Sequence, residues 1–496
     1  MKIFSAAQIK NWDVFTIENE SIESLELMER AAMACSRWIL DHRYSQRNFL
    51  IFCGTGNNGG DGLAIARMLL QSNCSATVYI TGETGTKDFE ANLEKIQLHG
   101  GLLPTILTPG TFPVITPNMV VVDALFGTGL NRPPAGISAE IIDHINSGTA
   151  PVISIDMPSG LFADTSSKGN CIIKATHTLT FQQFKLAFLL PENDPYCGEV
   201  HILNIGLDKT FESETDVAFE LTERTLIKSI RKPRKRFSHK GNYGHAALLC
   251  GSYGMMGAAV LAAHSCLRSG AGKLTSYIPE CGYTTLQSTV PEAMCVVSGD
   301  KYIEDADDIE TFDAVGIGPG IGKHPSHISL LRSIFTQIKK SLLIDADALN
   351  ILAGDKELID LIPASSILTP HVGEFERLFG KTDNDFERLQ LALKKSSELD
   401  IYIVLKGQYS FISTPEGKGW FNSTGNAGMA TAGSGDVLSG FITGLLAQGY
   451  PPLQAALIGT YLHGLAGDIA AQKFSAEAMI AGDIVNCLGE AFKLIS

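Results

Sequence analysis

Apolar strands that end in glycine-rich polar turns recur along this chain, and this pattern constrains its fold more than any other feature. In the first half, "NFLIFCGTGNNGGDG" (48–62), "MVVVDALFGTGL" (119–130) and "PVISIDMPSGL" (151–161) each place an apolar run before such a turn. Helical segments separate them, and strands that alternate with helices indicate a parallel sheet covered on both faces. Ligands of such sheets bind beyond the carboxyl ends of the strands, so we expect the three turns to meet in one pocket.

The alternation of strands and helices weakens between residues 206 and 236 and then resumes. The stretches "GHAALLCGS", "DAVGIGPGIG", "SLLIDADALNIL" and "IYIVLKGQYSFIS" form further strand-to-loop units. A length of 496 residues exceeds one ordinary domain. We therefore predict two α/β domains, at residues 1–215 and 225–496, with different folds because no sequence repeat relates the halves. The basic stretch "RKPRKR" near the junction is interpreted as a solvated linker or domain entry.

Composition argues against several classes of partner. The formal net charge of −14 disfavours a general nucleic-acid or anionic-membrane binder. No run of about 18 apolar residues suggests a membrane span. The start lacks the apolar core of a signal peptide, and the ten cysteines form no C-x-x-C pair. We expect a cytoplasmic homo-oligomer with small-molecule substrates and with neither nucleic-acid nor membrane partners.

Polar residues in the three turns of the first half are candidates for a ligand site. Asn58 and Asp61 in the first turn suit a sugar, a phosphate or a cation, but a merely capped turn explains them equally well. Asp123 and Asp156 each end an apolar strand, where a carboxylate is costly unless it is paired or bound. Oxygens of Asn58, Asp123 and Ser159 would together satisfy a cation. Asp156 would then remain as a general acid or base.

The ordered motifs "NNGGDG", "VVDALFGTGL" and "DMPSGL", with "SLELMERAA" near the start, resemble the NAD(P)H-hydrate epimerase family over about the first 205 residues. The resemblance implies a Rossmann-like three-layer sandwich that converts the R form of the hydrated dinucleotide NAD(P)HX into the S form. It implies that Asp156 contacts the hydrated ring and that Asn58, Asp123 and Ser159 bind potassium. The implied substrate-binding residues are Asn57, Asn58, Gly59, Gly60, Asp61, Gly127, Thr128, Gly129, Leu130, Asn131, Arg132, Pro133 and Asp156.

In the second half, the stretch "NSTGNAGMATAGSGDVLSG" (422–440) places a glycine-rich loop before an apolar helix that starts near Asp436. Backbone amides of such a loop at a helix N-terminus can bind a phosphate. An aspartate there repels phosphate unless it acts as a general base toward the attacking hydroxyl. The alternative is a simple helix cap, which the helix dipole also favours. The glycine density favours the catalytic interpretation of Asp436, and Lys406 with Gly407 suits a nearby nucleotide phosphate.

The motifs "GAAVLAAHSCLRSGAG", "GIGPGIG", "DADALN", "TPHVGEFERL" and "NAGMATAGSGDVLSG" resemble the ADP- or ATP-dependent NAD(P)H-hydrate dehydratase family over residues 225–493. The resemblance implies a ribokinase-like fold, magnesium, and transfer of a phosphate to the C6 hydroxyl of S-NADHX or S-NADPHX before that phosphate leaves. ADP, giving AMP, is favoured over ATP. The implied contacts to the hydrate are Ala258, Gly320, His371 and Asp436. Those to the adenine nucleotide are Lys406, Gly407, Gln408, Tyr409, Ser410 and Gly435.

Two alternatives compete with this interpretation. The G-S-G-D loop alone also fits a vitamin or sugar kinase with an N-terminal binding module. Release of reduced dinucleotide, rather than of a stable phosphoester, distinguishes the dehydratase from that kinase. A non-catalytic scaffold is the second alternative for the first domain, and the presence of its acidic and amide site residues argues against it. We predict a bifunctional enzyme, an epimerase (isomerase) joined to an ADP-dependent dehydratase (lyase).

Overall fold

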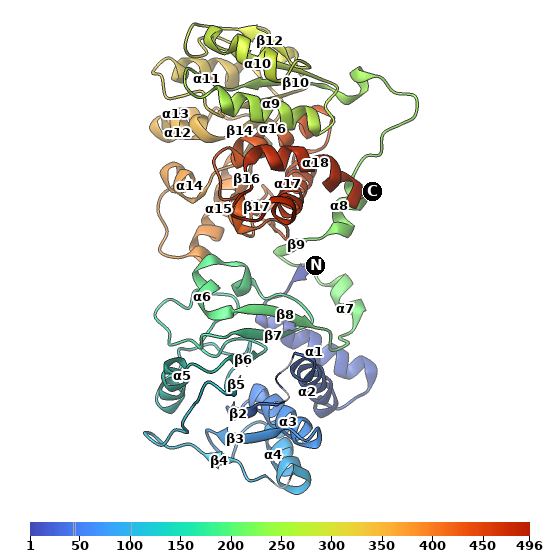
Figure 1. Ribbon diagram of the computed structural model, residues 1–496, viewed down its shortest axis with the longest axis vertical. Helices are drawn as coiled ribbons and strands as arrows, with labels where there is room; N and C mark the ends of the chain where they lie inside the picture. The colour runs from blue at the N-terminus through green and yellow to red at the C-terminus, as the bar shows by residue number, and fades with distance from the viewer. Residues whose placement is uncertain (43, 45, 101) are drawn as a thin grey trace. The chain divides into compact units, whose positions relative to one another are not determined.

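The computed structural model describes residues 1–42, 44, 46–100 and 102–496 (Figure 1). These residues divide into two compact units. The N-terminal unit holds Lys2–Val217 with Asn384–Phe386, and the C-terminal unit holds Met1, Ala218–Asp383 and Glu387–Ser496. Each unit has its own sheet and its own apolar core, and each is described separately below.

The N-terminal unit is built on a parallel sheet with the strand order β4-β3-β2-β5-β6-β7-β8. Its strands are β2 (Asn48–Cys53), β3 (Ser75–Ile80), β4 (Thr105–Ile106), β5 (Met119–Ala124), β6 (Val152–Ile155), β7 (His177–Phe181) and β8 (Glu199–Leu203); the short β1 (Lys2–Ile3) precedes them. Their apolar runs are buried because helices cover both faces of the sheet. Side chains alternate between the two faces, so β5 directs Val120 and Val122 into one core cluster and Val121 into the other.

The helices of the N-terminal unit fall on the two faces of this sheet. The core cluster that contains Val120 joins residues of α2, α3 and α4, whereas the cluster of Val121 joins residues of α5. The helices are α1 (Ala6–Glu20), α2 (Ser24–Asp41), α3 (Asn57–Gln71), α4 (Lys87–Gly100), α5 (Ile137–Ser147), α6 (Asp194–Cys197) and α7 (Lys209–Glu214). The result is the Rossmann-like three-layer sandwich that the sequence predicts, helices on each side of a parallel sheet.

The C-terminal unit has a larger mixed sheet, in which the order from β9 onward is β9-β18-β17-β16-β15-β14-β13-β10-β11-β12. Neighbouring strands from β16 to β12 run parallel, and β16, β17 and β18 form antiparallel pairs. The strands are β9 (Phe219–Thr222), β10 (His245–Leu249), β11 (Lys273–Ile278), β12 (Met294–Val297), β13 (Ala314–Ile317), β14 (Leu342–Ile344), β15 (Ile367–Leu368), β16 (Tyr402–Leu405), β17 (Phe411–Ser413) and β18 (Gly419–Asn422).

The helices α9, α16, α17 and α18 supply most of the buried residues of one core cluster of the C-terminal unit. Helices α9 and α16 approach so closely that a Cβ atom on Gly440 would lie 1.9 Å from the Ala262 carbonyl oxygen. The helices of the unit are α8 (Arg224–Ile230), α9 (Met256–Arg268), α10 (Tyr283–Thr289), α11 (His327–Gln337), α12 (Ala346–Gly354), α13 (Lys356–Ile359), α14 (Val372–Phe379), α15 (Asp385–Leu399), α16 (Ser434–Ala447), α17 (Pro452–Phe474) and α18 (Ala481–Leu494). This is the ribokinase-like α/β domain that the sequence predicts.

Both sheets have a point at which the strand order reverses, and ligands of open α/β sheets bind there. In the N-terminal unit the chain leaves β2 toward β3 on one side and returns with β5 on the other. In the C-terminal unit β10 has β11 on one side and β13 on the other. The glycine turns that follow β2, β5, β10 and β13 therefore lie where a ligand is expected.

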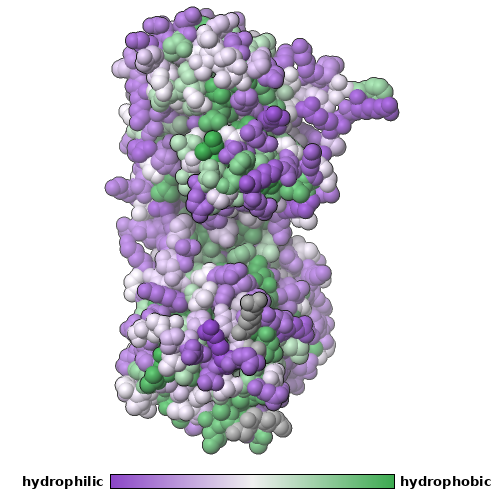
Figure 2. All heavy atoms as spheres, viewed as in Figure 1, coloured by the Kyte–Doolittle hydropathy of each residue, from purple (hydrophilic) through white to green (hydrophobic). Residues whose placement is uncertain are grey.

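The basic stretch between α8 and β10 projects from the C-terminal unit (Figure 1), and the projection is mostly hydrophilic in Figure 2. Its residues are largely exposed, Phe237 to 92%. Lys232 donates to the Gly449 carbonyl at 2.6 Å, and the Arg234 guanidinium lies 4.0 Å from the Tyr243 ring centroid. These contacts describe a solvated entry into the C-terminal unit. No helix among the described residues has the length and apolar content that a bilayer crossing requires.

Candidate functional sites in the two units

A cavity of about 1090 Å³ lies at the carboxyl ends of β2, β5, β6 and β7 in the N-terminal unit. It is lined by residues of all three glycine turns: Asn57, Asn58, Asp61, Gly127, Thr128, Gly129, Leu130, Asn131, Arg132, Pro133 and Asp156. Gly59 and Gly60 belong to the first turn of α3 and are not among the lining residues. The three motifs, which are far apart in the sequence, thus contribute to one cavity.

Asp156 follows β6, and two groups hold its carboxylate in place. Its carboxylate oxygen Oδ1 lies 2.9 Å from Lys185 Nζ, and Oδ2 accepts a hydrogen bond from the Thr128 amide at 2.9 Å. Its backbone has φ +65°, in the left-handed region that aspartate tolerates better than most residues. A Cβ atom on Gly127 would lie 2.7 Å from Oδ2 of Asp156, so a larger residue at this position would displace the carboxylate.

Two further carboxyl groups share the surroundings of Asp156. Burial and the charge of Asp156 raise the pKa of Asp13, on α1, to about 7, although the charge of Lys185 opposes the shift. Burial, followed by the charges of Asp156 and Asp13, raises the pKa of Asp61 well above its usual range. Lys185 is only 1% exposed and also donates to Thr180 Oγ1. This buried ammonium group therefore pairs with Asp156 and opposes the upward pKa shift of Asp13.

The predicted cation ligands Asn58, Asp123 and Ser159 lie beside this cavity, and they differ in whether their polar atoms already have hydrogen-bond partners. Both side-chain polar atoms of Asn58 are buried without a hydrogen-bond partner. The Asp123 carboxylate is fully buried and accepts hydrogen bonds from the Ser154 hydroxyl at 2.8 Å and from the Ser159 amide and hydroxyl at 2.9 and 2.5 Å. Burial nevertheless raises the pKa of Asp123. Asn58 therefore has an unsatisfied carboxamide, whereas Asp123 already has partners.

In the C-terminal unit, the glycine-rich loop leads directly into α16. The helix begins at Ser434 with Gly433 as its N-cap, so Asp436 lies in the first turn and is not the capping residue. Gly433 has φ +89°, a conformation that favours glycine. Burial, with the charge of Asp345, raises the pKa of Asp436 to about 6 despite the opposing charge of Lys406. Asp436 is thus a partly buried acid at the end of a helix whose amides favour an anion.

Lys406, which follows β16, is held by acidic side chains and lies next to the start of α16. Its Nζ donates to Asp345 Oδ1 at 2.9 Å and lies 3.9 Å from Glu374 Oε2. Burial lowers the pKa of Lys406, but the charges of Asp345 and Glu374 outweigh it, so the net shift is upward. A Cβ atom on Gly435 would lie 3.4 Å from Nζ. The predicted nucleotide residues Lys406 and Gly435 are therefore adjacent.

The remaining nucleotide residues form the turn between β16 and β17. The Ser410 hydroxyl accepts from the Gly407 amide at 3.3 Å, and Gln408 Nε2 donates to the Gly425 carbonyl at 3.4 Å. Tyr409 lies between them in the same turn. The turn is partly exposed and contacts the glycine-rich loop through Gln408.

The predicted hydrate contacts fall into two groups. A Cβ atom on Gly320 would lie 2.9 Å from Cβ of Ala258, which places the loop after β13 against the start of α9. His371 caps α14 by accepting from the Gly373 amide at 3.0 Å, and its side chain is 55% exposed. His371 also forms an isolated parallel bridge with Lys406. Burial, followed by the charge of Asp436, raises the pKa of Cys250, the residue that follows β10.

Several residues of these sites were not identified from the sequence. Asp13 and Lys185 come from segments outside the three turns, and nothing in their local sequence marks them. Asp345 begins the motif "DADALN", which is a signal for it, but only the fold shows its ion pair with Lys406. Asp468, on α17, accepts from the Gly425 amide at 3.0 Å and from Asn426 Nδ2 at 2.9 Å, and so anchors the glycine-rich loop.

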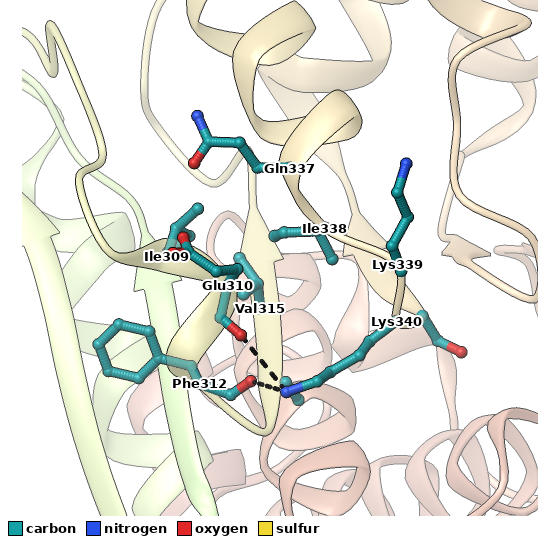
Figure 3. Close-up of a pocket in the computed structure, with 10 residues that line it drawn as sticks. Ile309, Glu310, Phe312, Val315, Gln337, Ile338, Lys339 and Lys340 are labelled. Carbon is teal, nitrogen blue, oxygen red and sulfur yellow. Dashed lines mark hydrogen bonds between the residues drawn. The ribbon is translucent and has the colours of Figure 1, made fainter.

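A smaller cavity of about 210 Å³ lies at the opposite end of the C-terminal sheet, before β13 and β14 (Figure 3). Lys340 extends into this region, where its Nζ donates to the carbonyl oxygens of Phe312 at 2.8 Å and Glu310 at 3.4 Å. The lysine is therefore satisfied by main-chain groups. None of the predicted site residues lines this cavity, and we assign it no catalytic role.

Comparisons with known proteins match both units. Residues 246–489 match the family described as NAD(P)H-hydrate dehydratase, and residues 24–187 match the family described as YjeF-related protein N-terminus. The chain is 35% identical to the bifunctional NAD(P)H-hydrate repair enzyme Nnr of Moorella thermoacetica, over 98% of this chain and 96% of that protein. It is 31% identical to the Nnr protein of Thermofilum pendens, over 100% and 97% of the two chains.

Among solved structures, the C-terminal unit resembles the ADP/ATP-dependent NAD(P)H-hydrate dehydratase from Bacillus subtilis, crystallised with ATP and Mg²⁺. The identity is 32% and the TM-score 0.49, over 56% of this chain and 98% of that one. The full-length relatives extend across both units, and their shared description favours epimerase and dehydratase activities over the vitamin or sugar kinase alternative. The chain belongs to the family of bifunctional NAD(P)H-hydrate repair enzymes.

Proposed function

We propose that the two activities of this repair enzyme use Asp156 in the N-terminal unit and Asp436 in the C-terminal unit. The observation that carries the proposal is a charge arrangement found in both sites. A lysine pairs directly with one aspartate, Asp156 or Asp345, and burial raises the pKa of a second aspartate nearby, Asp13 or Asp436. A carboxyl group that titrates near neutral pH suits general acid–base catalysis.

For epimerisation, we propose different roles for Asp13 and Asp156: Asp13 donates a proton, and Asp156 stabilises positive charge. Protonated Asp13 donates its proton to the C6 hydroxyl of R-NAD(P)HX, and the lone pair of the ring nitrogen expels water. The ionised Asp156, fixed by Lys185 and the Thr128 amide, stabilises the cationic ring. Water then adds to the other face of C6 and returns a proton to Asp13. The product is S-NAD(P)HX, and no atom or electron is gained.

We propose potassium as the ion of the N-terminal site. A hard cation prefers oxygen ligands, and Asn58, Asp123 and Ser159 supply a carboxamide, a carboxylate and a hydroxyl. The unsatisfied carboxamide of Asn58 supports this assignment, because a bound cation would satisfy its buried oxygen. The ion would supply positive charge beside the carboxylate of Asp123.

For dehydration, we propose that Asp436 accepts the proton of the C6 hydroxyl as that oxygen attacks the terminal phosphorus of ADP, releasing AMP. Phosphate then leaves with the help of the ring nitrogen, and loss of the C5 proton restores NADH or NADPH. Lys406, Gly435 and the turn from Gly407 to Ser410 would hold the nucleotide phosphates, and His371, Ala258 and Gly320 would contact the hydrate. Mg²⁺, bound with the nucleotide, would neutralise phosphate charge; Asp345 and Glu374 are oxygen donors of the type it needs.

The test follows the near-ultraviolet absorbance of reduced nicotinamide with pure S-NADHX, Mg²⁺ and either ADP or ATP. We expect absorbance to return with ADP in the wild type and to stay flat in Asp436→Ala. R-NADHX is then incubated with the wild-type enzyme and, separately, with the Asp156→Asn variant, with the enzyme in excess over R-NADHX in each case. If R-NADHX is consumed as fast in Asp156→Asn as in the wild type, the proposed role of Asp156 is wrong.

We also propose a cytoplasmic homo-oligomer. The ten cysteines are free thiols, most of them buried, as expected in a reducing compartment. Phe237 in the projecting basic stretch is 92% exposed, and a contact between copies would cover it. Light scattering on the purified chain measures the mass directly, and a mass equal to one chain would contradict the oligomer.

A further inference from the structure

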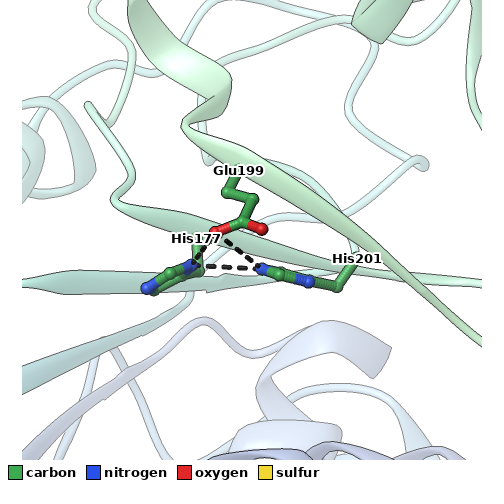
Figure 4. A group of neighbouring side chains, drawn as sticks. All are labelled: His177, Glu199 and His201. Carbon is green, nitrogen blue, oxygen red and sulfur yellow. Dashed lines mark hydrogen bonds and ion pairs between the residues drawn. The ribbon is translucent and has the colours of Figure 1, made fainter. Parts of the chain in front are cut away.

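Two histidines and a glutamate converge at the amino ends of β7 and β8, the end of the sheet opposite the cavity of the N-terminal unit. His177 starts β7, and Glu199 and His201 lie two residues apart on β8. In the parallel register His177 pairs with Glu199 and Leu179 pairs with His201. Because side chains alternate along a strand, Glu199 and His201 lie on the same face, and Figure 4 shows all three side chains directed at one point.

The distances between the three converging atoms match those between ligands of one metal ion. His177 Nδ1 lies 3.1 Å from His201 Nε2, and Glu199 Oε2 lies 3.6 Å from the first nitrogen and 3.7 Å from the second. Ligand atoms at about 2.0–2.1 Å from a tetrahedral Zn²⁺ are about 3.3–3.4 Å apart. Two imidazole nitrogens and one carboxylate oxygen are also the donor set that zinc accepts with a fourth position open.

The surroundings hold the two imidazoles in orientations suited to such binding. The other ring nitrogen of His177, Nε2, lies 3.1 Å from the Tyr44 hydroxyl, the kind of outer partner that fixes a metal-bound histidine. The Trp38 ring packs against both imidazoles, with centroids 5.1 and 4.6 Å away. The side chains of His177 and His201 are only 17% and 19% exposed.

We propose that His177, Glu199 and His201 bind a divalent transition metal ion of the zinc class. Glu199 is 70% exposed, so water from solvent would complete the coordination. The site joins the start of β8, the edge strand of the sheet, to its neighbour β7. Its nitrogen ligands distinguish it from the oxygen-ligand sites proposed for potassium and magnesium. The metal would stabilise the N-terminal unit away from the reacting groups.

The test uses the full chain without an affinity tag, stripped with a chelator and titrated with Zn²⁺ by calorimetry. We expect one tight site in the wild type and a loss of at least about 100-fold in affinity in His177→Ala and in His201→Ala. Co²⁺ gives a second readout, since a tetrahedral site produces strong visible absorption. Glu199→Gln changes an exposed side chain and should weaken Zn²⁺ binding without affecting folding.

His42→Ala is the matched control, because this neighbouring imidazole lies 6.0 Å, centroid to centroid, from His201 and is not one of the three ligands. It should bind Zn²⁺ as the wild type does. Circular dichroism of each variant checks that it is folded. The proposal is overturned if the wild type takes up no Zn²⁺ at the tight site, if folded His177→Ala or Glu199→Gln binds Zn²⁺ as tightly as the wild type, or if His42→Ala loses the site.

Discussion

The two units use different folds to build the same local charge pattern. In the N-terminal unit Lys185 pairs with Asp156 and leaves Asp13 with a pKa raised to about 7; in the C-terminal unit Lys406 pairs with Asp345 and leaves Asp436 with a pKa raised to about 6. Burial is the largest cause of each shift, followed by the charge of the paired aspartate. One lysine cannot fully compensate a buried carboxylate and a second, partly buried one, so the second acid titrates near neutrality.

The units differ in where the proposed catalytic carboxylate stands in this pattern. Asp156 is the paired acid, fixed in place by Lys185, whereas Asp436 is the second acid and lies in the first turn of a helix. The difference suits the two reactions. Epimerisation needs a fixed negative charge beside a cationic ring and a separate proton donor. Phosphoryl transfer needs one base that can accept a proton next to a phosphate-binding loop.

The largest effect is expected for Asp436→Asn, which removes the proposed base without changing size. We expect the ADP-dependent recovery of reduced nicotinamide to fall by about 10³-fold, within the range for general-base removal. Epimerisation of R-NADHX should stay within about twofold of the wild type, because the change lies in the other unit. Dehydration at the wild-type rate would show that Asp436 is a structural residue of the first turn of α16.

The next largest effect is expected for Asp13→Asn. Removal of the proposed proton donor should lower the rate of epimerisation by about 10²-fold and leave ADP-dependent dehydration unchanged. The matched control is Asp88→Asn, which removes another carboxylate from the lining of the same cavity. Chiral separation of R- and S-NADHX measures the rate. An equal loss in both variants would indicate that total negative charge, and not a proton donor, matters.

The pH dependence of the two activities should have opposite signs. Asp13 acts in its protonated form, so epimerisation should decline as pH rises through about 7. Asp436 acts in its ionised form, so dehydration should increase as pH rises through about 6. Rates at saturating substrate across this interval, measured on one preparation, provide the check. If both activities changed with pH in the same direction, the proposed roles of protonated Asp13 and ionised Asp436 would be contradicted.

A smaller effect on epimerisation is expected from two glycine substitutions in the turn that packs against Asp156. In Gly127→Ala the new methyl group would meet Asp156 Oδ2, and we expect epimerisation to fall by about 10-fold or more as the carboxylate moves. In Gly129→Ala, two residues further along the same turn, a Cβ atom has no neighbour within 4 Å. That variant should retain nearly full activity. Equal rates in the two variants would contradict a precisely placed Asp156 carboxylate.

The sequence predicts the two folds and the residues that follow strands, because apolar strands with glycine turns have a strong local pattern. Asn57, Asp61 and Asp156 line one cavity for this reason. The residues that set the charges are different. Asp13 and Lys185 reach the cavity from segments without any such pattern, and Asp345 pairs with Lys406 across 61 positions. Contacts between distant segments depend on tertiary packing, which a single sequence does not display.

The smallest predicted effect concerns the free energy of unfolding and tests whether the ionised Asp436 side chain destabilises the folded protein. Its pKa in the folded state, about 6, lies above the ordinary value of 3.8, so folding favours the protonated form. This group therefore contributes its full stability below the unfolded pKa, and the contribution is lost as pH rises through about 6. At neutral pH Asp436→Asn should increase the free energy of unfolding by on the order of 1–2 kcal/mol, after allowance for partial exposure.

Asp468→Asn should instead lower the free energy of unfolding, because the Asp468 carboxylate anchors the glycine-rich loop through Gly425 and Asn426. Thermal unfolding of both variants at neutral pH and again below pH about 4 separates the two cases. The stabilisation by Asp436→Asn should vanish at the lower pH, where the wild-type carboxyl is already protonated. If Asp436→Asn still has the higher free energy of unfolding below pH about 4, the introduced asparagine makes new stabilising contacts. The ionised Asp436 side chain would then not be what destabilises the folded wild type at neutral pH.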